Sequence, residues 1–407
     1  MVPDLVIAGA TLAGHATPMD VAIGAGRIIG IAPQIVAEAP RHAAEGNLLA
    51  PGLVECHIHL DKAGILERCA LERGTLAEAV AETARLKAGF TEEDVYARAA
   101  VVVEQAISHG TMAMRTFVEI DPRAGLRSFD AIKAIRADYA HAIPIEICAF
   151  AQEGLTNEPA TEPLLATALA DGADLVGGCS YTDPDPAEHI RRIFALAERF
   201  GVAADFHVDF DLDPEGSDLP AIIAETERRG WQGRVACGHA TKLAAMPPDA
   251  VAAMAALLAG AGIGIVALPA TDLFLLGRDA DRLAPRGVAP LMALAAAGVV
   301  TAVASNNILN PFTPFGDASL LRQANLFANV AQLSRDSDLD QAFAMIGANA
   351  ARLLGRAHGL AVGAAADLVL IDATSEADAV RRCAPVLAGW KNGRQSFVRP
   401  RAALLGR

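Results

Sequence analysis

The sequence predicts an α/β protein, a (β/α)8 barrel of the TIM type with a small β-sandwich-like domain built from both ends of the chain. Eight short apolar segments alternate with helical patterns through the middle of the chain, at a spacing of roughly 30 to 40 residues. Residues 1–50 and 360–407 instead share a pattern of short strands and turns. The length of 407 residues suits one large barrel with an appended domain.

The two ends of the chain have the pattern of β-hairpins. Residues 4–12, 19–33 and 46–52 alternate short apolar runs with glycine, and residues 366–373 and 386–397 repeat this pattern. Lys391-Asn392-Gly393 is a hairpin-turn signal within the last of these segments. The first residues lack the basic start of a signal peptide and predict a strand. We therefore expect residues 1–50 and 360–407 to form the small domain, and residues 51–359 to form the barrel.

The barrel is predicted from the order of its strands and helices. The expected strands are residues 53–60, 113–120, 144–150, 173–179, 202–209, 234–240, 262–268 and 299–305. Helical patterns lie between them, for example at residues 76–89, 187–201, 248–262 and 288–298. A doubly wound open sheet is the competing fold, but no GxGxxG motif follows the first strand to support it.

The composition excludes several classes of function. The net charge is −14 and no basic run is present, which argues against nucleic acid or an anionic membrane as a partner. No segment reaches the roughly 18 consecutive apolar residues expected of a membrane span. The six cysteines lack CxxC spacing and are interpreted as small apolar residues in a reducing cytoplasm. The Ala-rich helices permit a homo-oligomer without requiring one.

Four of the ten histidines stand at predicted C-terminal ends of barrel strands, where the active sites of such barrels lie. His57 and His59 end the first strand and, being two residues apart, point to the same side of it. His207 and His239 end the fifth and sixth strands. This clustering predicts a site for one divalent metal ion, zinc or iron, because neutral imidazole binds such ions.

Several motifs together resemble the cytosine deaminase and N-isopropylammelide amidohydrolase-like branch of the amidohydrolase superfamily. They are PGLVECHIHLDK, AFAQEG, the histidines of the fifth and sixth strands, ALPATDLFLLGRDADRLAPRGVAPL and NNILNPFTPFGDASLL. The resemblance covers essentially the whole chain. It implies that His57, His59 and His207 bind the metal, and that His239 lies near the substrate and the water that attacks it. It also implies that Gln152 bonds a ring amide and that Phe312 packs near the ring.

Two positions depart from the pattern of that branch. A glutamate that shuttles a proton is expected three residues after His207, where this chain has Phe210. An aspartate that takes a proton is expected at the eighth strand, where this chain has Asn306, and asparagines also replace the following acidic positions. Asparagine is neutral and cannot act as a base. The expected bases are therefore Asp61, Asp209, Glu119 or His239, while Lys62 or Lys242 supplies positive charge.

The function expected from these residues is metal-dependent hydrolysis of a C–N bond in a small cyclic nitrogen compound, by deamination or by ring or amide cleavage. Phe210 then faces the substrate in place of the shuttle, and Asn306 stands where the usual base would be. The alternative is a descendant of the fold that binds a ligand without catalysis or with altered chemistry. A lyase or isomerase that uses Lys62 or Lys242 without metal is a third interpretation.

Overall fold

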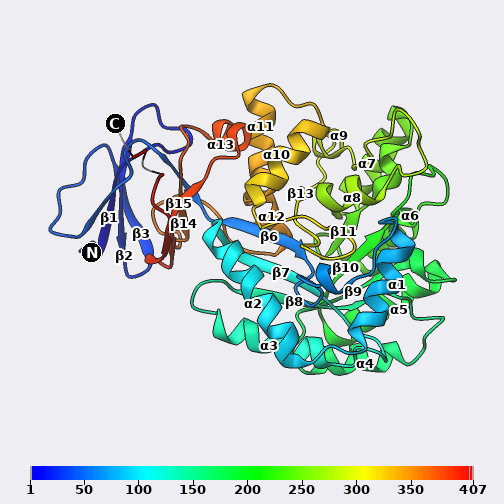
Figure 1. Cartoon of the computed structure of the whole chain (residues 1–407). Helices are drawn as coiled ribbons and strands as arrows, with labels where there is room; N and C mark the ends of the chain where they lie inside the picture. The colour runs from blue at the N-terminus through cyan, green and yellow to red at the C-terminus, as the bar shows by residue number, and fades with distance from the viewer. Residues whose placement is uncertain (1, 403, 406–407) are drawn as a thin grey trace.

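The computed structural model describes residues 2–402 and 404–405, and its largest part is a nearly closed barrel of eight parallel strands (Figure 1). The strands are β6 (Leu53–Ile58), β7 (Thr111–Glu119), β8 (Ile145–Ala151), β9 (Leu175–Cys179), β10 (Ala203–Val208), β11 (Val235–His239), β12 (Gly264–Ala267) and β13 (Thr301–Val303). They neighbour one another in chain order, and a parallel bridge between Ile58 and Asn306 joins the two ends of the sheet. The predicted (β/α)8 barrel is therefore confirmed.

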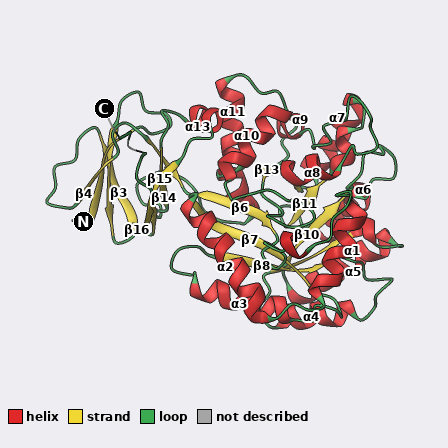
Figure 2. Cartoon of the chain, in the orientation of Figure 1, coloured by secondary structure: helices red, strands yellow, loops and turns green. Residues whose placement is uncertain are grey.

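Helices surround the barrel on its outer side (Figure 2). They are η1 (Leu66–Arg68), α1 (Leu76–Lys87), α2 (Glu92–Ser108), α3 (Arg127–Asp138), α4 (Thr161–Ala170), η2 (Ser180–Thr182), α5 (Pro186–Phe200), α6 (Leu219–Arg229), η3 (Thr241–Ala244), α7 (Pro248–Gly260), α8 (Pro269–Leu275), α9 (Leu291–Ala296), α10 (Leu320–Val330), α11 (Asp336–Met345) and α12 (Ala348–Leu353). Helix α5 illustrates how the sequence specifies them. Asp185 caps its start and Gly201 ends it with a φ of 70°, while Ile190, Ile193 and Phe194 recur on its buried face.

Two smaller sheets are built from the ends of the chain. The first has the order β3 (Arg27–Ala32), β2 (Met19–Gly24), β1 (Leu5–Ala10) and β4 (Arg41–Ala43). The second has the order β16 (Arg394–Val398), β15 (Val386–Lys391), β14 (Leu368–Ile371) and β5 (Leu48–Pro51). Because β5 pairs with β14, the two ends of the chain share a sheet, as expected. The domain limits at residues 50 and 360 stay a prediction.

The C-terminal sheet agrees with the expected hairpin but also contains a helix that was not predicted. Lys391 pairs with Arg394, and the two residues between them, Asn392 and Gly393, have φ values of 48° and 73°, as a type I′ turn requires. Helix α13 (Glu376–Arg382) lies between β14 and β15 in the chain and packs against α10 and α11 of the barrel. The C-terminal segment therefore contacts the barrel as well as the small sheets.

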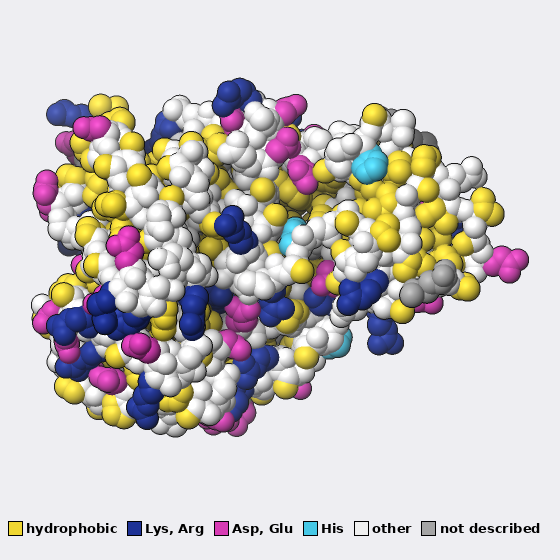
Figure 3. All heavy atoms as spheres, turned by 180° about the vertical axis from the view of Figure 1, so that it is seen from behind, with side chains coloured by type: hydrophobic (Ala, Val, Ile, Leu, Met, Phe, Trp, Pro, Cys, Tyr) yellow, Lys and Arg dark blue, Asp and Glu magenta, His cyan; other side chains and the backbone are white. Residues whose placement is uncertain are grey.

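The surface charges, the helix hydropathy and the state of the cysteines bear on the expectations from sequence. Figure 3 shows acidic and basic side chains intermixed over the barrel, and apolar side chains gathered over the small sheets. Among the described residues, no helix has the length and hydropathy needed to cross a membrane. All six cysteines are free thiols; Cys56, Cys148, Cys179 and Cys237 are buried, whereas Cys69 is half-buried and Cys383 is exposed.

Candidate active site and metal centre

Three histidine side chains meet at the C-terminal end of the barrel. His57 belongs to β6 and His59 follows its last residue, while His207 belongs to β10 on the opposite wall. The Nε2 atom of His207 lies 2.9 Å from Nε2 of His57 and 3.0 Å from Nε2 of His59. All three side chains are buried, and their ligand atoms lie within 4.8 Å of one another. The strand spacing therefore brings together three imidazoles that are far apart in the sequence.

The surroundings of the three rings keep them neutral. Burial lowers the pKa of His57, His59 and His207 well below its usual value, and the nearby positive charge of Lys62 lowers it further. Phe117 and Phe150 pack against the rings, with centroid distances of 4.1 Å from Phe117 to His57 and 4.2 Å from Phe150 to His207. Each ring therefore presents an unprotonated nitrogen, the form that binds a metal ion.

This arrangement fits one divalent ion. Neutral imidazole nitrogen is a common ligand of zinc and iron. The Nε2 separations of 2.9 and 3.0 Å are short enough for the three nitrogens to share one ion. The Nδ1 atoms of the three rings have no hydrogen-bond partner among the described residues, so Nε2 is the nitrogen that each ring turns toward its neighbours. The cluster thus has the ligand type and the short distances between ligand atoms that are typical of a metal site.

A fourth histidine, His239, is fixed beside this cluster by a carboxylate. His239 ends β11 with a left-handed φ of 70°, and its Nδ1 lies 2.7 Å from Oδ1 of Asp272. The other oxygen of Asp272 accepts a hydrogen bond from the backbone N–H of Leu268 at 3.1 Å, and burial raises the pKa of Asp272. The pair leaves Nε2 as the free nitrogen of His239. Asp272 was absent from the predicted site residues, although it lies within the quoted segment ALPATDLF.

The asparagines after β13 build the turn that closes the barrel. Asn306 has a φ of 58°, its backbone N–H donates to the carbonyl of His57, and its own carbonyl accepts from the N–H of His59, both at 2.8 Å. Its side-chain Nδ2 donates to Oγ1 of Thr271 at 3.0 Å, whereas its Oδ1 has no partner among the described residues. Asn310 donates to Oδ1 of Asn307 at 2.7 Å. One amide oxygen, that of Asn306, is thus left free beside the histidines.

A small cavity lies over these groups. Its lining residues are His59, Lys62, Leu76, Gln152, Tyr181, His207, Phe210, His239, Thr271, Asn306, Asn307 and Phe312. Of the predicted substrate-contacting residues, Gln152, Phe210 and Phe312 all belong to this lining. Phe210 packs on His239 with a centroid distance of 4.4 Å. Leu76, Tyr181 and Thr271 were not predicted, because no motif or strand-end position singles them out.

Among the described residues, no carboxylate lines the cavity, and the predicted acidic bases have other partners. Asp61 accepts the backbone N–H of Glu119 at 2.9 Å, and Glu119 contacts two lysines. Asp209 accepts from the hydroxyl of Ser217 at 2.5 Å and from a backbone N–H of the same loop. Of the four bases expected from sequence, only His239 therefore faces the cavity.

The two lysines predicted to supply positive charge lie in different places. Lys62 belongs to the cavity lining, where its Nζ is 4.4 Å from the centre of the Phe312 ring. Lys242 instead binds the loop after β10: its Nζ donates to Oδ1 of Asp211 at 2.7 Å and to the carbonyls of Asp213 and Glu215, both at 3.0 Å. Lys242 thus holds a loop, while Lys62 is available to the cavity.

Comparisons with known proteins show which family the chain belongs to. Residues 95–397 match the model of the amidohydrolase family. The chain is 33% identical over 361 residues to a pterin deaminase from Rhizobium rhizogenes, covering 87% of this chain and 82% of that protein. It is 28% identical over 405 residues to the N-isopropylammelide isopropyl amidohydrolase of a Pseudomonas species, covering 96% of both chains.

A solved structure is similar over nearly the whole chain. The 5-methylcytosine deaminase of Klebsiella pneumoniae, crystallised with 5-fluorocytosine, superposes with a TM-score of 0.93. It is 28% identical in sequence, and the match covers 98% of each chain. Together with the barrel and its histidine cluster, these matches show that the chain belongs to the amidohydrolase family, whose members are hydrolases that act on C–N bonds.

Proposed function

We propose that this protein is a metal-dependent amidohydrolase that removes an amino or alkylamino group from a small nitrogen-containing ring. The observation that carries the proposal is the meeting of His57, His59 and His207 beside the His239–Asp272 pair, in a cavity with aromatic walls. The similar proteins are named for pterin, 5-methylcytosine and N-isopropylammelide, all of which are small cyclic nitrogen compounds.

The metal would be held by His57, His59 and His207. When bound, a zinc or iron ion supplies Lewis acidity and makes water acidic enough to react near neutral pH. The three neutral imidazoles bring no negative charge to the ion. Asn306 adds none either, since its free amide oxygen can orient water or contact the ion but cannot take a proton. The full positive charge is thus retained at the reacting end of the cavity.

His239 is the group that we assign to proton transfer. The reaction adds water to a ring carbon and breaks the bond from that carbon to the amine, so the water must lose a proton and the amine must gain one. Asp272 accepts a hydrogen bond from Nδ1–H of His239 and so fixes the tautomer in which Nε2 takes and returns a proton. This pair replaces the strand-end carboxylate that the chain lacks at Asn306.

The remaining walls would position the ring. Phe210 and Phe312, with Leu76 and Tyr181, provide flat apolar surfaces for it. Gln152 offers an acceptor and a donor, which suits a ring amide. Because Phe210 cannot shuttle a proton to a ring nitrogen, we infer that the substrate needs no such protonation, or receives it from His239.

The test combines metal content with turnover. We expect the purified protein to hold a zinc or iron ion, and to release ammonia or an alkylamine from at least one aminopyrimidine, aminotriazine or pterin. His207→Ala should lose the ion, whereas His141→Ala, a change at an exposed histidine outside the site, should keep it. A metal-loaded protein that releases no amine from the whole panel would refute the proposal and favour a ligand-binding role.

A further inference from the structure

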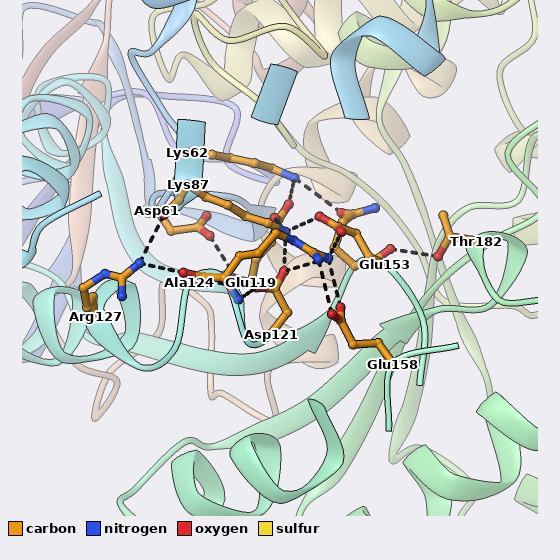
Figure 4. A network of polar contacts seen from close by, with 12 residues as sticks. Asp61, Lys62, Lys87, Glu119, Asp121, Ala124, Arg127, Glu153, Glu158 and Thr182 are labelled. Atoms are coloured by element: carbon orange, nitrogen blue, oxygen red, sulfur yellow. Dashed lines mark hydrogen bonds and ion pairs between the residues drawn. The ribbon is translucent and has the colours of Figure 1, made fainter. Parts of the chain in front are cut away.

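Two buried lysines, Lys62 and Lys87, share the carboxylate of Glu119 (Figure 4). The Nζ atom of Lys62 donates to Oε1 of Glu119 at 2.6 Å, and the Nζ atom of Lys87 donates to Oε2 of the same side chain at 2.9 Å. The two lysine side chains are each 2% exposed and that of Glu119 is 3% exposed. Each oxygen of Glu119 is thus committed to a different ammonium group.

Lys87 is the centre of a larger cluster. Besides Glu119, its ammonium group contacts Asp121 at 2.5 Å and the carboxylate of Glu153. Arg123 contacts Glu153 as well, and Glu158 at 2.9 Å. The cluster ties helix α1 to the end of β7 and to the segments that follow β7 and β8, because its members come from these elements. Lys62 meets this cluster only at Glu119.

Lys62 is also the member of the cluster that lines the cavity. Its Nζ lies 3.4 Å from Oε1 of Gln152 and 4.4 Å from the centre of the Phe312 ring, both of which belong to the cavity wall. Helix α1 reaches the cavity as well: Leu76 at its first position lines it, and Lys87 at its last position holds Glu119. The Lys62 ammonium group is thus hydrogen-bonded to Glu119, a residue that does not itself line the cavity.

The charges favour this arrangement strongly. Burial alone acts to raise the pKa of Glu119, but the ammonium groups of Lys62 and Lys87 outweigh it and lower that pKa to about 2. Glu119 is therefore a carboxylate at neutral pH, and it faces two cations rather than one. A carboxylate held by Lys87 on one side can direct Lys62 on the other, because a charged hydrogen bond is short and directional.

We propose that Glu119 and Lys87 are positioning residues that hold the Lys62 ammonium group against the substrate, with Lys87 acting through Glu119. This inference rests on the proposed function, since it assumes that the ring occupies the cavity that Lys62 lines. Without Lys87, the side chain of Glu119 can adopt another rotamer. The Lys62 ammonium group, which is hydrogen-bonded to Glu119, then moves away from Gln152 and Phe312.

A double-mutant cycle tests the inference. We expect Lys87→Met to lower kcat/KM by about 10- to 100-fold, the size of effect that a displacement of about 1 Å at a reacting site produces. In a Lys62→Met background, the same substitution should change kcat/KM by less than about twofold, because the group that it positions is gone. Equal losses in the two backgrounds would overturn the inference, since they would show that Lys87 acts on the fold alone.

A second variant covers the case in which Lys87→Met does not fold. Glu119→Gln keeps the shape of the side chain but removes the shared charge, and its effect on kcat/KM should also vanish in the Lys62→Met background. Asp121→Asn is the matched control, because Asp121 contacts Lys87 but has no contact with Lys62. A loss of kcat/KM in Asp121→Asn as large as that in Glu119→Gln would contradict the inference.

Crystal structures of Lys87→Met and of the unaltered protein separate this inference from the proposed function, because they require no turnover. We expect the Nζ atom of Lys62 to move away from Gln152 and Phe312 in the variant. An unchanged Lys62 would overturn the positioning role, even where the enzyme turns over a ring substrate. Absence of turnover by the metal-loaded unaltered protein would instead count against the proposed function.

Discussion

A methyl group at Gly238 should disable the proposed metal centre while leaving the barrel folded. A Cβ atom built on this residue of β11 would lie 2.5 Å from Cε1 of His57 and 2.9 Å from its Nδ1. Ordinary carbon contacts begin near about 3.5 Å, so the ring would have to retreat by about 1 Å. That displacement is about half the length of a metal–nitrogen bond of roughly 2.0–2.1 Å. Gly238→Ala should therefore remove His57 from the ligand set.

The expected magnitude is a loss of at least about 100-fold in zinc affinity, or about 3 kcal/mol, because one of three imidazole ligands is lost. Competition with a chromogenic chelator measures this affinity, and circular dichroism checks the fold. Gly178→Ala is the matched control, since its Cβ would lie 2.1 Å from Nε2 of His189, a buried histidine outside the metal cluster. It should lower the thermal stability but leave the zinc affinity unchanged. A folded Gly238→Ala protein with unaltered zinc affinity would refute the reasoning.

Three further substitutions test the site and the loop beside it. Asn306→Asp should tighten zinc binding in the same competition assay, because it adds an anion beside the histidines; a weaker site would show that this side chain does not face the ion. Asp272→Asn should lower kcat by about 100-fold or more with the metal content unchanged, and an unaltered kcat would remove His239 from proton transfer. Burial raises the pKa of Asp209 to about 6 in the folded chain, above about 3.9 when unfolded, so its carboxyl destabilises the fold increasingly as the pH rises between these values. Relative to the unaltered protein, Asp209→Asn should therefore gain about 2–3 kcal/mol of unfolding free energy between about pH 4 and pH 7 in urea titrations, and a constant difference would contradict the shifted pKa.

The barrel and its histidines could be predicted because they depend on local patterns. Each of the eight apolar segments became a strand, and parallel strands bring their C-terminal ends to one face whatever their distance in the chain. His57, His59, His207 and His239 therefore met as expected. The role of Asp272 could not be read in the same way, because it lies on α8, after a strand whose end carries no histidine.

The position of a residue at a strand end did not predict whether its side chain points into the cavity. Asp209 follows His207 by two residues and would face the same side on a regular strand, but its φ of 53° turns the chain and directs the carboxylate to Ser217. Lys242 follows the next strand and binds the loop of Asp211 for a similar reason: Ala240, before it, also has a left-handed φ of 51°. Such reversals depend on tertiary hydrogen bonds, which a single sequence does not display.

The bridge between Ile58 and Asn306 has a consequence for how the barrel resists opening. It joins the segment after the last strand to the first strand by two backbone hydrogen bonds, one made by His57 and one by His59, which lie on either side of Ile58. A ligand or ion bound jointly by these histidines and by His207 on the opposite wall would stabilise this junction between the first and last strands. Local unfolding of the junction would then require release of the bound ligand or ion. The amide hydrogens of His59 and Asn306 should therefore exchange with solvent more slowly when the site is filled.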